Sequence, residues 1–318
     1  MTQNSRRKFL KNSALFGGAT LAGSIFPSSL FGSSPCMDKV ALSGHVWVYA
    51  SQYPPNWDCT PILEQVFRDF NVAGLEGIEF MESNLRHSAI FAYLPNPLQR
   101  RGETYQFVKY LSEKYNVPVT GTSYSAAMWD KNQHHKILDD VEVVLERLNQ
   151  LKGSTFGITV GDAGRIKTNE ELDIQAELLK KIISICKKND IQANLHNHTF
   201  EMENNLHDFK GTIERVPDLK LGPDINWLIR AGVDPVWFID TYGDRMVYLH
   251  LRDQDENGKW TRALGQGTTD FPAVSKALKK VNFKGRAAIE LAFEEPPNGP
   301  VSQEWIESRE YVKEIFGW

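Results

Sequence analysis

Five residues of acid–base or metal-binding type follow hydrophobic runs in the second half of the chain. His196 and His198 stand in ANLHNHTFE, Asp224 in LKLGPDINW, His250 in MVYLHLRD and Glu290 in RAAIELAF. Two histidines at positions i and i+2 of an extended chain point to the same side. A buried imidazole or carboxylate at the end of a hydrophobic strand is costly unless it is paired or binds a metal. These residues therefore predict one shared site, either a metal centre or a metal-free polar pocket.

Mixed histidine and carboxylate donors define which metals fit such a site. They suit Mn²⁺, Co²⁺, Zn²⁺ or Fe²⁺ and suit Ca²⁺ poorly, so one divalent metal ion is expected. The three cysteines, Cys36, Cys59 and Cys186, form no CxxC pair, and a thiolate zinc site is not expected. A disulfide between Cys59 and Cys186 stays open as an alternative.

The elements that must position these residues alternate along the chain. Short apolar runs predict strands, and amphipathic segments between them predict helices. The expected strands cover 39–50, 75–80, 117–127, 154–161, 191–200, 219–225, 245–253 and 285–293. The expected helices cover 60–74, 103–116, 134–151, 169–189, 206–216, 235–242, 271–281 and 303–316.

Strict alternation with continuous apolar strands favours a parallel sheet covered by helices. Eight such units suit an α/β protein with one domain, a (β/α)8 TIM barrel over residues 37–318. An open doubly wound sheet is the alternative, although no GxGxxG motif follows any expected strand. Active sites of such barrels lie at the carboxyl ends of the strands. The successive intervals, from His196 to Asp224, from Asp224 to His250 and from His250 to Glu290, each equal one strand–helix unit, so these side chains should converge there.

The first 36 residues predict an export signal. They contain the twin arginine Arg6-Arg7 and then a Gly- and Ala-rich apolar run, which resembles the twin-arginine signal of bacteria. We therefore expect a protein exported to the periplasm. That run is too short and too rich in glycine for a stable membrane span.

Charge narrows the classes of partner. The first 36 residues carry four basic residues and no acid, so the chain without them is four charges more negative than the −4 of the whole sequence. An acidic protein has no general attraction for nucleic acid or anionic lipid. We expect a small carbohydrate as the partner and no nucleic acid, and an oligomer remains compatible with the sequence.

The last third of the chain carries a family resemblance. GPDINWLIRAGVDPVWFIDTYGDRMVYLHLRD, ALGQGTTDF and AAIEL look like the xylose isomerase-like barrels known as sugar phosphate isomerases/epimerases. That resemblance implies a divalent metal held by the fifth to eighth strands, here by His196, Asp224, His250 and Glu290. His198 is the alternative fifth-strand ligand. This chain has His196-Asn197-His198 where many members have Glu-Asn-His, and Arg252 where a lysine often follows the seventh-strand histidine.

The histidine at position 196, where many members have glutamate, affects the expected reaction mechanism. In the epimerase branch two metal-bound glutamates exchange the proton next to a carbonyl, but this chain offers an imidazole at one of those positions. A metal-bound imidazole has little basicity left. The expected catalytic residues are therefore Glu290 with His198 or Glu201 as its partner, unless the reaction uses one base.

Four further residues are expected to bind substrate. Glu79 ends the second strand and would bind a sugar hydroxyl, act as acid or base, or form a salt bridge with a residue such as Arg252. Trp227 belongs to a possible stacking wall. Arg252 is expected to fix a ligand or substrate oxygen. His45 is a substrate-binding candidate or a core histidine, and Asp253 is expected on a solvated loop.

The sequence thus predicts a metal-dependent isomerase or epimerase of a sugar or keto-sugar. A keto-sugar lyase or dehydratase would use the same enediolate intermediate. A carbohydrate-binding barrel without catalysis is a further alternative, whereas an endonuclease IV-like hydrolase would need more histidines and a basic face. Export favours an unphosphorylated sugar.

Overall fold

The computed structural model describes residues 40–55, 57–86, 104–295, 297 and 300–318. The signal expected over residues 1–36 lies outside this part of the chain. Within the described part, the strands form one eight-stranded parallel sheet in the order β6-β5-β4-β3-β2-β1-β8-β7. They are β1 (Leu42–His45), β2 (Gly77–Met81), β3 (Val119–Ser125), β4 (Thr155–Thr159), β5 (Gln192–Leu195), β6 (Lys220–Leu221), β7 (His250–Leu251) and β8 (Ala287–Ile289).

The sheet curls until its first and last strands meet. Strand β1 pairs with both β2 and β8, and His45 lies in register with Glu79. The two ends of the sheet, β6 and β7, are joined by isolated bridges, Leu221 with Met246 and Asp224 with His250. Backbone hydrogen bonds from Val247 N–H to Leu221 O and from His250 N–H to Pro223 O, both 2.9 Å, complete this seam.

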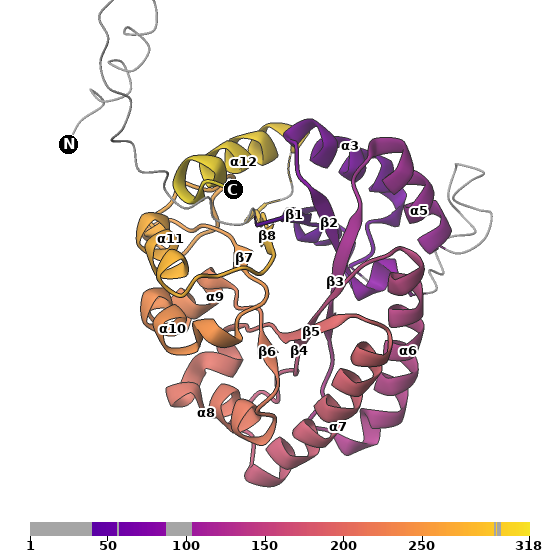
Figure 1. Cartoon of the computed structure of the whole chain (residues 1–318), viewed down its shortest axis with the longest axis vertical. Coiled ribbons are helices and arrows are strands. Elements are labelled where there is room, and N and C mark those ends of the chain that lie inside the picture. The colour runs from indigo at the N-terminus through magenta and orange to yellow at the C-terminus, as the bar shows by residue number, and fades with distance from the viewer. Residues whose placement is uncertain (1–39, 56, 87–103, 296, 298–299) are drawn as a thin grey trace, which may run out of the picture. The chain divides into compact units, whose positions relative to one another are not determined.

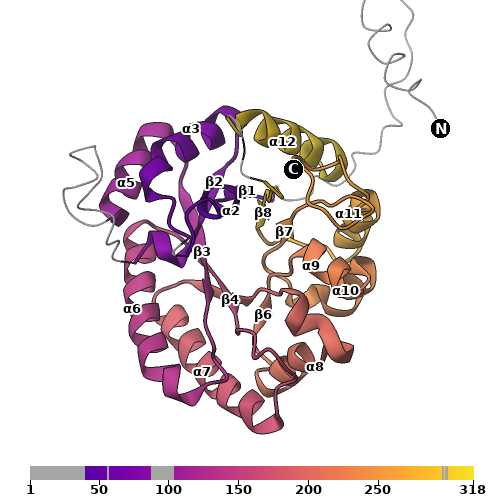
Figure 2. The same ribbon diagram turned by 180° about the vertical axis from the view of Figure 1, so that it is seen from behind.

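Helices form the outer layer around the strands, as Figures 1 and 2 show from the two sides. Helices α3 and α12, which are distant in the sequence, pack against each other. The helices are α2 (Trp47–Ala50), α3 (Leu63–Ala73), α5 (Thr104–Tyr115), α6 (His134–Gln150), α7 (Asn169–Lys188), α8 (Thr199–Arg215), α9 (Ile225–Arg230), α10 (Pro235–Tyr242), α11 (Phe271–Lys280) and α12 (Ser302–Phe316).

Local sequence explains where several helices begin and end. Helix α3 buries Val66, Phe67, Phe70 and Ala73, the spacing of one helical face. It ends at Gly74, whose φ of 70° is a conformation that glycine adopts without a steric penalty. Thr168 and Glu171 form a capping box at the start of α7, which satisfies two backbone N–H groups there.

Two segments differ from the expectation. The strand expected over 39–50 ends at His45, and Trp47–Ala50 forms a short helix. The ring Nδ1 of His45 accepts a hydrogen bond from Trp47 N–H (3.2 Å), which turns the chain out of the ladder. The helix expected over 206–216 forms the second part of α8, and non-helical residues 203–206, with Asn204 and Asn205 in the left-handed region, separate it from an unexpected first turn that begins at Thr199.

The predicted α/β class and the (β/α)8 barrel are confirmed. Among the described residues no helix is long and apolar enough to cross a membrane. The Cys59–Cys186 disulfide is not formed, because both residues are buried free thiols.

Candidate active site

The predicted residues gather at the carboxyl ends of the strands. His45 ends β1, Glu79 lies in β2 and His250 lies in β7, while Asp224 begins α9 directly after β6. Glu290 follows β8, and His196 and His198 follow β5. A cavity of about 1140 Å³ opens at the opposite end of the barrel, and none of these residues lines it.

The rings of His196 and His250 face each other through their Nδ1 atoms. Their Nδ1 atoms lie 3.1 Å apart and their ring centroids 4.6 Å apart. Burial lowers the pKa of His196 well below its usual value, and the neighbouring His250 lowers it further. His196 is therefore neutral, with one ring nitrogen that can accept a hydrogen bond or bind a cation.

Two carboxylates of the site share one arginine. Arg252 Nε lies 2.9 Å from Asp224 Oδ2, and another guanidinium nitrogen pairs with Glu290 Oε1. Burial alone would raise the pKa of Glu290, but Arg252, His45 and His250 outweigh it and hold the pKa well below the usual range. For Asp224 burial dominates and raises the pKa, although Arg252 opposes it.

The other oxygen of Asp224 has a structural role. Asp224 Oδ1 accepts hydrogen bonds from Asn226 N–H (2.9 Å) and Trp227 N–H (3.1 Å), which caps α9. Asp224 Oδ2 is buried and forms no hydrogen bond of good geometry. The cap thus fixes this carboxylate with one oxygen directed into the site.

Glu79 contacts β7 rather than Arg252. Its Oε2 accepts hydrogen bonds from Tyr248 O–H (2.7 Å) and from His250 Nε2 (2.9 Å). Burial would raise the pKa of Glu79, but His250 outweighs it and lowers the pKa. Burial likewise lowers the pKa of His250, yet Glu79 and then Glu290 raise it to about 9.

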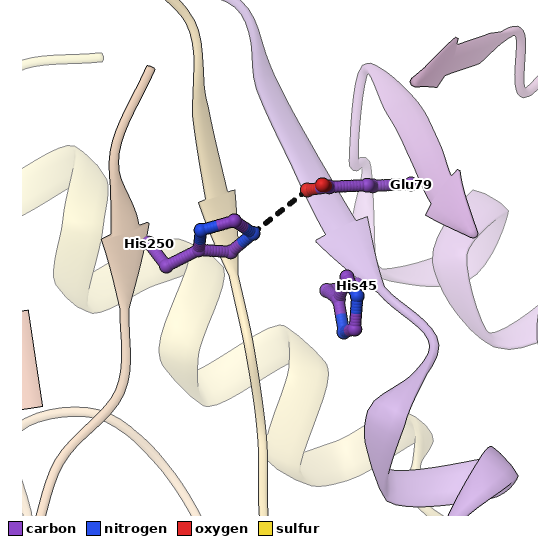
Figure 3. A group of neighbouring side chains, drawn as sticks. All are labelled: His45, Glu79 and His250. Atoms are coloured by element: carbon purple, nitrogen blue, oxygen red, sulfur yellow. Dashed lines mark hydrogen bonds and ion pairs between the residues drawn. The ribbon is translucent and has the colours of Figure 1, made fainter. Parts of the chain in front are cut away.

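Figure 3 shows His45, Glu79 and His250 pointing toward one another from three strands. One ligand atom from each residue lies within 4.8 Å of the other two, a spacing that a metal ion could bridge. His45 Nδ1 also lies 3.4 Å from Glu290 Oε1, while its Nε2 lies 3.3 Å from Ser123 Oγ. Burial lowers the pKa of His45.

The ring of His198 meets that of His196 edge-on, at a centroid distance of 5.1 Å. The same ring stacks on Phe200 at a centroid distance of 5.5 Å and contacts Trp227 at 5.4 Å. Burial and then Arg252 lower the pKa of His198 to about 4. Its Nδ1 and the Nε1 of Trp227 are buried atoms without a hydrogen-bond partner. These two groups therefore offer unsatisfied polar atoms beside an aromatic wall.

Glu201 supports the backbone of this segment. Its Oε2 accepts a hydrogen bond from His198 N–H (2.7 Å) at the start of α8. The side chain is 1% exposed, and burial raises its pKa to about 8. Glu201 thus lies behind His198 rather than beside His250.

Sequence reasoning missed three contributors to the site. Tyr248 holds Glu79, and its place two residues before His250 puts both on one face of the chain. Trp260 packs over Arg252, with 4.9 Å from guanidinium carbon to ring centroid. Asp253, expected on a solvated loop, is instead buried and accepts hydrogen bonds from Gly265 N–H and Gly267 N–H, both 2.9 Å. The Gly-rich loop folds around this carboxylate because its glycine N–H groups can approach closely.

The residue types His196, Asp224, His250 and Glu290 suit a divalent cation, while the ligand atoms that all lie within 4.8 Å of one another among the described residues belong to His45, Glu79 and His250. Asp224 Oδ2 has no hydrogen bond of good geometry, and two imidazole Nδ1 atoms face each other at 3.1 Å, a separation typical of two ligands of one metal ion. Glu290 supplies a second ionised carboxylate nearby. The three carboxylates Glu79, Asp224 and Glu290 outnumber the two cationic groups that pair with them, Arg252 and His250, which leaves negative charge for a cation to balance.

Comparisons with known proteins agree with this architecture. The sequence profile described as xylose isomerase-like TIM barrel matches residues 67–315. No curated protein sequence matches significantly.

Solved structures with this fold include sugar isomerases and epimerases. A sugar phosphate isomerase/epimerase from Parabacteroides distasonis has a TM-score of 0.65 and 14% identity, over 91% of this chain and 98% of that one. A D-allulose 3-epimerase from a Methylomonas species, in complex with D-allulose, has a TM-score of 0.66 and 16% identity, over 87% and 97%. A 3-keto-D-glucoside 4-epimerase from E. coli has a TM-score of 0.65 and 16% identity, over 87% and 100%.

Proposed function

Because the chain belongs to the xylose isomerase-like TIM barrel family, we propose that it is a divalent-metal-dependent isomerase or epimerase of a sugar or keto-sugar. The observation that carries this proposal is the meeting of His196, Asp224, His250 and Glu290 at the ends of four consecutive strands. The similar fold of a D-allulose 3-epimerase and a 3-keto-D-glucoside 4-epimerase supports the same class of reaction.

The proposed ligands are Nδ1 of His196 and His250, Oδ2 of Asp224 and a carboxylate oxygen of Glu290. A divalent ion held there would polarise a sugar carbonyl and stabilise the enediolate that forms when the adjacent carbon loses its proton. Two imidazoles and two carboxylates suit Mn²⁺, Co²⁺, Zn²⁺ or Fe²⁺. Arg252 holds both ligand carboxylates in place, so it acts on the substrate through them.

Glu290 is the proposed base. Its low pKa keeps the carboxylate ionised at neutral pH, so it can accept the proton from the carbon next to the carbonyl. We assign the partner role to His198, because its Nδ1 is unpartnered and its ring lies beside Trp227. Glu201 then holds the backbone of His198 in place from behind.

An uncharged sugar fits this site better than a sugar phosphate. Arg252 is already paired with Asp224 and Glu290 and is not free to bind a phosphate group. Trp227 Nε1 and His198 Nδ1 supply a donor and an acceptor for hydroxyl groups. The proposed export through the twin-arginine sequence points to the same class of substrate, since sugar phosphates are chiefly intracellular.

Elemental analysis of the purified, untagged protein tests the metal site. We expect about one equivalent of Mn, Co, Zn or Fe per chain, lost in His196→Ala and kept in His198→Ala. Loss in His198→Ala alone would identify His198 as the ligand. A wild-type protein without metal, which also takes up none from added salts, would overturn the proposed metal site.

Proton exchange in D2O tests the reaction even before its product is identified. The protein is incubated with D-fructose, D-allulose and a 3-keto-glucoside, and NMR follows deuterium incorporation next to the carbonyl. Incorporation with a change of configuration supports the epimerase, and a shifted carbonyl supports the isomerase. Release of the aglycone identifies the lyase. Binding of these sugars with no exchange in the metal-loaded protein would leave a carbohydrate-binding barrel.

A further inference from the structure

Glu79 is a buried carboxylate whose hydrogen-bonding partners are protein groups on the far side of the barrel. It is 1% exposed, and it reaches from β2 to His250 in β7 (Figure 3). Its Oε2 accepts two hydrogen bonds, from Tyr248 O–H at 2.7 Å and His250 Nε2 at 2.9 Å. A side chain with these contacts is placed to act on His250.

The contact with Glu79 decides which ring nitrogen of His250 keeps its proton when the other nitrogen binds a metal ion. An ionised carboxylate only accepts hydrogen bonds, so Nε2 of His250 must be the donor. Nδ1 is then the nitrogen turned toward His196, whose own Nδ1 lies 3.1 Å away. With the proton on Nε2 held by Glu79, Nδ1 is the nitrogen that would give up its proton to a cation and bind it.

His45, the third member of the group in Figure 3, does not share this role. Its Nδ1 accepts a hydrogen bond from Trp47 N–H (3.2 Å), so the proton of its neutral ring is on Nε2, beside Ser123 Oγ. That nitrogen is a donor and is unsuited to ligate a metal. A cation between His45, Glu79 and His250 would moreover have to displace the 2.9 Å hydrogen bond between the last two.

We propose that Glu79 is a positioning residue for the metal ligand His250. Its carboxylate holds the Nε2–H tautomer, fixes the plane of the ring and makes Nδ1 a stronger donor to the cation. Such carboxylate–histidine–metal arrangements change metal affinity by about 10–100-fold when the carboxylate is removed. The proposal rests on the proposed metal site, and it gives Glu79 a task other than contact with the sugar.

The zinc-loaded wild-type protein, labelled with ¹⁵N in histidine, provides a test that needs no substitution at Glu79. Long-range ¹H–¹⁵N correlation spectra distinguish a metal-bound nitrogen from one that carries a proton, and His250→Gln assigns the signals. We expect His250 to bind zinc through Nδ1 and to keep its proton on Nε2. Zinc on Nε2 of His250 would overturn the proposal and favour the His45, Glu79 and His250 group as the metal site.

Zinc affinity, measured by competition with a chelator, provides the second test. Glu79→Gln keeps the size of the side chain but removes its charge, and we expect zinc to bind about 10–100-fold more weakly. Tyr248→Phe is the matched control, because it removes the other hydrogen bond to the same oxygen and leaves the carboxylate on His250. We expect that variant to stay within about 3-fold of wild type, below the range that loss of such a carboxylate gives.

The outcomes separate this proposal from the proposed function. Tight zinc binding by wild type together with unchanged affinity in Glu79→Gln would overturn the role of Glu79 and leave the metal site intact. Equal losses in Glu79→Gln and Tyr248→Phe would point to packing and also overturn it. No zinc binding by wild type would overturn the metal site itself, and with it this proposal.

Discussion

Arg252 links the two carboxylates that the proposed mechanism needs. It is 4% exposed and pairs with Asp224 and Glu290, which are also buried. Removing one partner of a buried ion pair leaves an uncompensated charge, and this loss outweighs the modest net value of the pair. The arginine therefore matters for the stability of the metal-free protein as well as for the arrangement of the ligands.

Arg252→Met should destabilise the metal-free protein by about 3–5 kcal/mol, because Asp224 and Glu290 lose their counter-charge. Urea unfolding measures the free energy, and added Mn²⁺ should recover part of the loss. Arg262→Met is the control, since Arg262 is half exposed in its pair with Glu304 and should cost less than about 1 kcal/mol. Equal effects of the two substitutions would contradict this expectation.

His198→Ala should separate catalysis from metal binding. Loss of a general acid–base group lowers kcat by about 10²–10⁴-fold, whereas metal content should stay at the wild-type level. The measurement is kcat for the sugar that the D2O experiment identifies. His135→Ala serves as the control, because the side chain of His135 is 91% exposed on α6. Loss of metal together with activity would make His198 a ligand instead.

At the scale of elements, the start of α8 shows what sequence patterns miss. The hydrogen bond from His198 N–H to Glu201 Oε2 starts a helical turn at Thr199, which non-helical residues 203–206 separate from the helix expected near residue 206. Capping boxes are usually recognised by Ser or Thr at the first position. Here His198 occupies the first position, so the pattern suggests a catalytic site rather than a helix cap. The sequence therefore predicts a catalytic base at Glu201, whereas in the structure this side chain accepts the hydrogen bond from His198 N–H.

Glu201 should make stability fall with rising pH. Its folded-state pKa of about 8 lies above its usual value near 4.5, with burial as the main cause. Between these values the folded protein keeps a proton that the unfolded chain has released, so the free energy of unfolding decreases as pH rises and levels off above pH 8. The loss is at most about 1.4 kcal/mol per pH unit.

Urea unfolding from pH 5 to pH 9 should reveal this slope as a difference between wild type and Glu201→Gln. The glutamine oxygen can still accept the His198 N–H, so the cap is kept while the titration is removed. The variant should therefore gain stability relative to wild type toward high pH. Parallel curves over this range would show that Glu201 does not titrate there.

At the scale of the whole molecule, the sequence predicted the closed barrel and the residues at the carboxyl ends of its strands. It did not predict which side chains contact each other across the barrel. The spacing of one strand–helix unit was enough to bring His196, Asp224, His250 and Glu290 to one end of the barrel. The partner of Glu79 was not predictable, because His250 lies 171 residues away and only the curl of the sheet brings it close. The contact between His45 and Glu290 was also not predictable, because it forms where β1 and β8 pair.

Hydrogen exchange should locate the stabilising effect of a bound cation at the seam between β6 and β7. The amides of His250 and Val247, which donate to Pro223 O and Leu221 O, should exchange more slowly when zinc is added. The amide of Ile78, which donates to Pro118 O next to the β2–β3 pair on the opposite side of the ring, is the reference. Uniform slowing at all three amides would indicate general stabilisation and contradict a local effect.

The proposed metal site would also hold the two ends of the sheet, β6 and β7, together. Asp224 and His250 form one of the two bridges that join β6 to β7, and both are proposed ligands. A cation bound to them would add a cross-link between the two ends of the sheet, which otherwise meet only through these bridges and their backbone hydrogen bonds. Metal binding would then activate the site and stabilise the contact between β6 and β7 at the same time. Without the metal, the protein would lack activity and would also have a weaker contact between these two strands.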